Sequence, residues 1–422
     1  MKLITLLFFA FFNFLSLSTT LLYSQIEETI SPSVKTVQLH PANNIMGYPI
    51  INIGKNQTLN LSFDEPGSMV KNYYYSIELY DREWNKSGLI YTDYLNGSQV
   101  NEIRDYNYSY NTSFDYIHYN LTIPNSQIQI TRSGNYALKI FEDNNRENPV
   151  IIKKFYINEE AVSVNAAITN PSSGIVRDSH QQITFDVMHP TFTIHDPLNQ
   201  VKATIIQNRR KDNRVENLKP YFVRADELDF RYSTETQFEG GNEFRYVDLR
   251  STRFFSDKIE NIEFTDPFYH VTLFPEIPRQ SRSYRYKEDI NGGYIIDVQE
   301  GNTPATESDY MFVHFTFKAE EPFLNKNLYI NGALTNWKLN KESKMEYNSA
   351  KGEYQLSLLL KQGYYNYQYL LKPKEGNKGS LQKTENSFQQ TENDYLIIIY
   401  YRGSNDICDR IIATKRINSI KR

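Results

Sequence analysis

Alternating apolar and polar positions dominate this chain. Leu59, Leu61 and Phe63 alternate with polar residues, a period of two that turns one face of a β-strand into a core. The same period recurs at residues 75–79, 136–140, 162–168, 183–187, 313–317, 354–358 and 365–369. Short strands with regular turn signals predict an all-β fold of tandem immunoglobulin-like or early-set β-sandwich domains. No helical periodicity of useful length accompanies them.

Turn-forming clusters separate the predicted strands and suggest the domain boundaries. Asn331-Gly332 is a strong turn dipeptide, and residues 301–308 have the composition of a linker. We expect an N-terminal sandwich at residues 26–160, a middle β-rich domain at residues 161–305 and a C-terminal early-set-like sandwich at residues 306–422. The last predicted strand, residues 395–401, is assigned to that C-terminal sandwich. The number of sandwiches in the less regular middle region stays open.

The N-terminus has the pattern of an export signal. Residues 3–15 are apolar apart from Thr5 and Asn13, which is typical of a secretory signal peptide and short of the roughly 20 residues of a membrane span. We predict a signal peptide at residues 1–25, cleaved just after Ser24 or Gln25. An uncleaved anchor is the alternative. We expect a soluble mature protein, because no later segment is long and apolar enough to cross a bilayer.

Composition changes this picture in two respects. The chain has 33 tyrosines and 25 phenylalanines but a single cysteine, Cys408, so an exported domain of this size would be held together by packing without an internal disulfide. The formal net charge of −4 is too mild to imply a nucleic-acid partner.

Candidate chemistry is sparse. The chain has no Gly-x-Ser-x-Gly sequence, no phosphate-cradling glycine-rich loop and no dinucleotide fingerprint. His189 and His195, with Asp186 and Asp196 nearby, could hold a metal, but loop histidines beside an aspartate are far more often surface residues. A glycosidase carboxylate pair stays open, because its members can be distant in the chain. We predict no catalytic residues, no cofactor and no metal, and look for the function in binding.

One short module offers a carbohydrate-binding alternative. The sequence from Asn331 to Trp337, with the tyrosine-rich segment at residues 363–369, resembles the early-set sandwich of glycogen- and starch-binding modules. Such modules stack sugar rings on exposed aromatic side chains, so the resemblance makes Trp337 a candidate sugar contact. The other interpretation is that Trp337 packs beneath the Asn331-Gly332 turn as part of the fold.

The order of several segments points to a specific family. These segments are residues 79–84 (LYDREW), 94–97 (YLNG), 119–125 (YNLTIPN), 133–136 (SGNY), 238–246 (FEGGNEFRY), 248–251 (DLRS) and 289–294 (DINGGY). Together with the export signal they resemble the plug protein family of the type IX secretion system in Bacteroidetes. The resemblance implies a periplasmic, non-enzymatic monomer that binds the outer-membrane translocon barrel, closes its channel and meets the membrane only through that partner.

A candidate contact surface lies in the irregular middle region. Arginine and aromatic side chains dominate interface energetics, and they are dense between residues 245 and 255. In the alternative interpretation, Phe244 and Tyr246 fill the core while Arg250 and Arg253 cap loops. The residues predicted for the partner interface are Arg245, Tyr246, Arg250, Arg253, Phe254 and Phe255.

Overall fold

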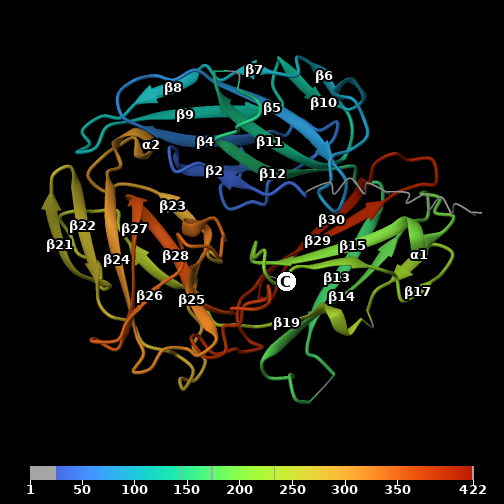
Figure 1. Ribbon diagram of the computed structural model, residues 1–422. Coiled ribbons are helices and arrows are strands. Elements are labelled where there is room, and N and C mark those ends of the chain that lie inside the picture. The colour runs from blue at the N-terminus through green and yellow to red at the C-terminus, as the bar shows by residue number, and fades with distance from the viewer. Residues whose placement is uncertain (1–24, 144, 173, 232, 421–422) are drawn as a thin grey trace, which may run out of the picture.

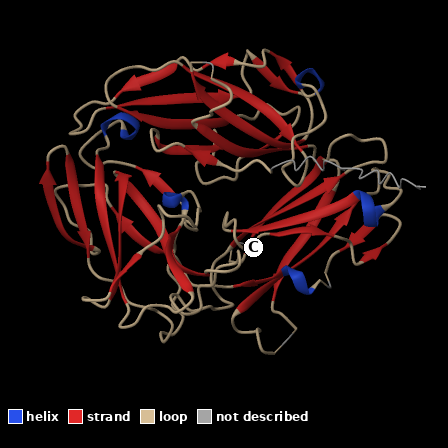
Figure 2. Cartoon of the chain, in the orientation of Figure 1, coloured by secondary structure: helices blue, strands red, loops and turns tan. Residues whose placement is uncertain are grey.

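The structure is a computed structural model that describes residues 25–420 except 144, 173 and 232. The expected signal peptide lies outside the described residues apart from Gln25. The described chain is all-β, as predicted, and Figure 2 shows strands in every part of it. The helical elements are single turns: α1 (Pro197–Gln200), α2 (Pro304–Glu307) and 3₁₀ segments at Tyr91–Asp93, Thr234–Thr236 and Ala333–Thr335.

The first unit, called here the N-terminal unit, packs two sheets around one core. One sheet has the order β1 (Thr29–Ile30), β12 (Ile151–Asn158), β11 (Gly134–Glu142), β5 (Tyr73–Tyr80) and β7 (Asn101–Glu102), with β3 (Ile50–Asn52) parallel to β12. The other is β2 (Lys35–Pro41), β4 (Leu59–Pro66), β9 (Tyr116–Ile123) and β8 (Asp105–Tyr108), and β6 (Leu95–Gly97) pairs with β10 (Ile128–Ile130). The predicted alternation is confirmed here, because Leu61, Phe63, Ile77 and Leu138 are all fully buried between the sheets.

The middle unit is built from two stretches of chain that are far apart in sequence. One sheet is β13 (Ser163–Thr169), β14 (His180–Met188), β18 (Glu227–Asp229) and β17 (Phe222–Val223), with β19 (Gln237–Glu239) on β14. The other is β16 (Val215–Leu218), β15 (Val201–Gln207), β29 (Asp394–Tyr401) and β30 (Arg410–Asn418). The last two strands of the chain therefore return to the middle unit.

The inserted unit lies between β19 and β29 in sequence. One sheet is β20 (Arg245–Asp248), β28 (Gly363–Pro373) and β23 (Tyr294–Ile296), with β25 (Lys326–Asn331) also on β28. The other is β21 (Ile259–Thr265), β22 (Phe268–Leu273), β24 (Tyr310–Lys318), β27 (Glu353–Lys361) and β26 (Glu346–Asn348). The predicted turn at Asn331-Gly332 falls at the end of β25.

The strand pairing differs from the expected division at residues 305/306 in two respects. Strands β20 to β22 pair within the inserted unit, and β29 pairs with β15 rather than with the strands expected in the C-terminal sandwich. The physical reason is that β29 is buried on both faces. Ile397 and Ile399 enter the core of the middle unit, while Leu396 and Ile398 pack in a second apolar cluster. A strand that is apolar on both faces is buried fully only when it is central in its sheet and covered on both sides.

That second cluster joins the N-terminal and middle units. Trp84, Ile152 and Tyr156 of the N-terminal unit pack there against Ile206 and Ile398 of the middle unit. Figure 1 shows the N-terminal unit across the top of the view, the inserted unit below it at the left and the middle unit at the right. The three units thus meet near the centre of the molecule.

Candidate functional site

The predicted contact surface divides into a buried and an exposed part, and Arg245 belongs to the buried part. Its side chain is 8% exposed and forms ion pairs with Glu385 at 3.0 Å and Glu276 at 3.1 Å. Burial alone would raise the pKa of Glu385, but Arg245 and Arg279 lower it to about 2. The structure therefore corrects the placement of Arg245 on a surface, since its charge is neutralised inside the protein.

Tyr246 and Arg250 are partly buried and anchor the loop that follows β20. The Tyr246 hydroxyl donates to Asp257 Oδ2 at 2.7 Å, across the loop. Arg250 Nη2 lies 2.7 Å from Asp248 Oδ2, and its Nη1 lies 3.4 Å from Asp297. These contacts engage the polar groups of both side chains within the protein, so their main effect is to fix the loop.

The exposed part is the tip of this loop. Phe254 is 73% exposed and Phe255 is 52% exposed, and Arg253 is exposed beside them. The backbone N–H groups of Arg253 and Phe254 donate to Ser251 Oγ at 3.1 and 3.0 Å, which orders the turn. Phe274, 50% exposed, donates its N–H to the Lys258 carbonyl at the end of the loop. We call Arg253, Phe254, Phe255 and Phe274 the aromatic tip.

Trp337 occupies a packing position. Its side chain is 7% exposed, its ring meets Phe244 edge-to-face at 6.2 Å, and it lies over Gly292. Gly292 has φ +74°, and a Cβ there would come within 2.4 Å of the indole ring. A ring covered in this way has no free face for a sugar. This arrangement matches the packing interpretation of Trp337.

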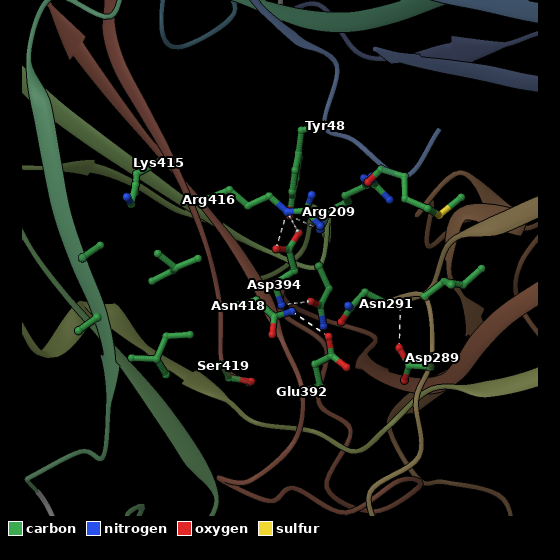
Figure 3. A pocket seen from close by; sticks show the side chains of 17 residues that line it. Tyr48, Arg209, Asp289, Asn291, Glu392, Asp394, Lys415, Arg416, Asn418 and Ser419 are labelled. Atoms are coloured by element: carbon green, nitrogen blue, oxygen red, sulfur yellow. Dashed lines mark hydrogen bonds and ion pairs between the residues drawn. The ribbon is translucent and has the colours of Figure 1, made fainter. Parts of the chain in front are cut away.

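A cavity of about 930 Å³ lies where residues of all three units meet, and Figure 3 shows the side chains that line it. Tyr48 of the N-terminal unit places its ring 5.0 Å from the Arg209 guanidinium and 6.0 Å from that of Arg416. Arg416 in turn lies 2.7 Å from Asp394, and both belong to the middle unit. Cation–π contacts and an ion pair therefore hold the wall between these two units.

Asp289 supplies the wall of this cavity that comes from the inserted unit. Burial raises the pKa of Asp289 to about 7, although its oxygens accept hydrogen bonds from the Asn291 N–H at 2.7 Å and the Phe244 N–H at 2.6 Å. Both oxygens are thus occupied by backbone donors. The carboxyl group ties the 242–244 and 289–291 segments together, which is a structural use of a perturbed group.

A further polar contact, missed by sequence reasoning, joins the N-terminal and inserted units. Lys361 Nζ lies 2.6 Å from Asp64 Oδ2, and the Tyr310 hydroxyl donates to the same oxygen at 2.6 Å. His118 Nδ1 lies 2.6 Å from Asp64 Oδ1. Lys361 also lies 4.0 Å from the centre of the Tyr116 ring. We call these five residues the Asp64–Lys361 hub.

Two absences apply to the described part of the chain. No group of three or more His, Cys, Asp or Glu side chains could hold a metal ion within residues 25–420, the three undescribed positions excepted. Over the same residues, no helix has the length and hydropathy of a membrane span.

Comparison with known proteins identifies the family. Residues 34–159, which contain most of the N-terminal unit, match the "Type 9 secretion system plug protein 1st domain". The chain belongs to the plug protein family of the type IX secretion system. This family is a component of a secretion system and not a known enzyme family. Its members are therefore associated with the secretion machinery.

Solved structures extend the similarity beyond the first domain of the plug family. The crystal structure of a hypothetical protein from Parabacteroides merdae ATCC 43184 is 31% identical, with a TM-score of 0.91 over 94% of this chain and 100% of that chain. Trypsin-activated alpha-2-macroglobulin from Escherichia coli is 8% identical over 93% of this chain and 29% of its own, and its TM-score of 0.19 supports no inference. No curated protein matches the chain.

Proposed function

We propose that this protein binds the periplasmic end of the outer-membrane translocon barrel of the type IX secretion system and closes its channel. The observation that carries the proposal is the match of residues 34–159 to the first domain of the secretion plug protein. The protein would reside in the periplasm and contact the outer membrane only through the barrel. It would act as a monomer without a cofactor, because closing a channel requires binding and no chemistry.

The way the units are joined supports such a role. A wide, water-filled barrel leaks solutes unless a body of sufficient stiffness covers its opening. Here the N-terminal unit shares the apolar cluster of Trp84 and Ile398 with the middle unit and the Asp64–Lys361 hub with the inserted unit. Buried contacts on both sides resist relative motion of the three units. The molecule can therefore act as one body.

The aromatic tip is the surface that we assign to the barrel. On an ordered turn, Phe254 exposes most of its surface and Phe255 about half. The backbone N–H of Phe274 donates a hydrogen bond to the same loop. Exposed aromatic residues beside an arginine have the composition of binding hot spots. Because the tip protrudes from β20 and β21, it can contact a partner without disturbing the core beneath it.

Affinity purification from the native host tests the proposal. The tagged protein should recover a large outer-membrane barrel. The double variant Phe254→Ser/Phe255→Ser should lose most of that recovery while keeping its unfolding temperature. Ile175→Ser is the matched control, because Ile175 is 94% exposed in the middle unit. If the unaltered protein recovers no barrel, the proposed function is wrong; if the double variant recovers it normally, only the assignment of the surface is wrong.

Closure itself needs a separate measurement. The purified barrel, reconstituted in a planar bilayer, should lose conductance when the protein is added to its periplasmic side. Binding without a fall in conductance would support a secretion partner but contradict closure.

A further inference from the structure

A second cavity, of about 980 Å³, also lies where the three units meet. It is lined by basic side chains from each unit: Lys153 and Lys154 on β12, Lys211 after β15, and Lys338 after the 3₁₀ turn at Ala333–Thr335. We call this space the cationic cavity. Its volume is at the upper end of the range of small-molecule sites.

The acidic residues of the cationic cavity do not balance its lysines. Glu28 lies 2.5 Å from Lys211 and 3.8 Å from Lys153, and it also accepts the backbone N–H of Lys154. Three other acids line the cavity: Asp212 and Glu216 are paired with Arg210 and Arg214, and Glu27 is exposed to solvent. One partly buried carboxylate thus serves two ammonium groups.

Lys154 and Lys338 have no carboxylate partner among the described residues. The Lys154 ammonium group lies 4.1 Å from the centre of the Trp84 ring. Lys338 makes no side-chain hydrogen bond or ion pair within the described part of the chain, although its neighbours on the cavity wall are Asn336 and Asn340. Two ammonium groups therefore line a partly enclosed space without a direct ion pair, and only more distant carboxylates, such as Glu28, attract them.

The surroundings of these two lysines disfavour their charged forms. Burial lowers the pKa of Lys154 to about 8, and the positive charge of Arg214 adds to the effect. Burial likewise lowers the pKa of Lys338, and repulsion from Lys211 lowers it further. An anion in the cavity would reverse these effects, because it would stabilise each ammonium group.

We propose that the cationic cavity binds a phosphate-bearing small molecule or headgroup with two or more negative charges. Ammonium groups bind phosphate as point charges without a fixed fork geometry, which suits lysines that converge from separate units. Several charges on one small ligand are needed to meet lysines on different walls. The inference does not depend on the channel partner, since it rests on the cavity alone.

Isothermal titration with sodium pyrophosphate at constant ionic strength tests the proposal. We expect saturable one-to-one binding and a higher unfolding temperature, because a ligand that contacts three units stabilises their assembly. Lys154→Gln/Lys338→Gln should weaken binding at least about tenfold. Lys154→Arg/Lys338→Arg should restore most of it. Lys374→Gln, at an exposed position of the inserted unit, is the matched control.

Two outcomes would overturn the proposal. One is the absence of saturable binding to both pyrophosphate and anionic vesicles. The other is equal binding by the unaltered protein and the Lys154→Gln/Lys338→Gln variant. Since glutamine removes repulsion without leaving a buried charge unpaired, the variant is expected to fold, and its unfolding curve checks this.

Sedimentation with vesicles distinguishes the two sources of phosphate. Binding to phosphatidylglycerol vesicles but not phosphatidylcholine vesicles, displaced by pyrophosphate and lost in the double glutamine variant, would identify a lipid headgroup. Pyrophosphate binding without vesicle binding would identify a soluble phosphate. Vesicle binding that the variant retains, without pyrophosphate binding, would contradict the proposal.

Discussion

Two charged junctions connect the units of this protein, and they differ in how buried charge is neutralised: the hub joins the N-terminal and inserted units, and the cationic cavity lies between all three. In the Asp64–Lys361 hub, one carboxylate meets Lys361, Tyr310 and His118, each at 2.6 Å. In the cationic cavity, Glu28 serves two lysines while Lys154 and Lys338 have no acidic partner. In the hub, the Lys361 ammonium group and the Asp64 carboxylate are paired directly with each other. The cavity has both space and unbalanced charge, so the contrast separates a structural site from a candidate binding site.

Removing Lys361 is expected to have the largest effect. Lys361→Ala leaves Asp64 buried with only His118 and Tyr310 as partners. Leaving a buried charge without its counter-ion costs about 3 kcal/mol, and urea unfolding should show a loss of this size. Lys351→Ala, at an exposed turn of the same unit, should change the free energy of unfolding by less than about 0.5 kcal/mol.

The double variant Asp64→Leu/Lys361→Met sharpens this prediction. It removes both charges, so it should recover most of the stability that Lys361→Ala loses. A Lys361→Ala protein as stable as the unaltered chain would show that the hub does not hold the units together.

The packing behind Trp337, which lines the cationic cavity, offers the next effect in size. At Gly292, φ is +74° and a Cβ would meet Trp337 and Phe244. Gly292→Ala therefore adds a steric clash to backbone strain. Gly376 is the matched control, because its φ is +113° and nothing lies within 4 Å of a Cβ there. We expect Gly292→Ala to cost about 2 kcal/mol more than Gly376→Ala in chemical unfolding; equal costs would mean that the wall yields easily.

The cavity of Figure 3 adds a dependence on pH. Burial raises the pKa of Asp289 to about 7 in the folded protein, above the usual value of about 4. The folded state then binds this proton more tightly than the unfolded state. Its stability should fall as pH rises from about 4 through 7. After allowance for solvent screening, we expect about 1 kcal/mol from this group.

Comparison with Asp289→Asn isolates that contribution. Other groups titrate alike in both proteins. The free energy of unfolding of the unaltered protein, minus that of the variant, should therefore fall by about 1 kcal/mol between pH 5 and pH 8. Urea unfolding at several pH values measures it. A difference that does not change with pH would contradict the assignment to Asp289.

The sequence predicts the strands of this protein much better than their partners. Alternation identified Leu59 to Phe63 and Tyr365 to Tyr369 as core segments, because the period of a strand is local. The sequence predicts β29 as a strand but not as a neighbour of β15, because the backbone hydrogen bonds between two strands do not depend on which side chains the partner strand carries. Its apolar run on both faces was the available clue to a central position.

The candidate sites show the same limit more sharply. Phe254 and Phe255 were singled out by composition, and the structure exposes them, whereas Arg245 in the same segment is buried. Asp64 and Lys361 are 297 positions apart, and each looks in sequence like an ordinary polar residue near the end of a strand. Contacts between units depend on how the sheets pack, which no local pattern reports.

The smallest expected effect tests the cationic cavity directly. Lys338→Gln removes a charge that burial disfavours and that Lys211 repels, so it should stabilise the ligand-free protein by about 0.5 kcal/mol at low salt. Part of the gain should disappear at high ionic strength, because salt screens the repulsion from Lys211 but not the cost of burial. Urea unfolding at 20 mM and at about 500 mM sodium chloride would measure both values. A loss of stability at low salt would show that Lys338 already has a favourable electrostatic environment, and the contrast between the two junctions would fail.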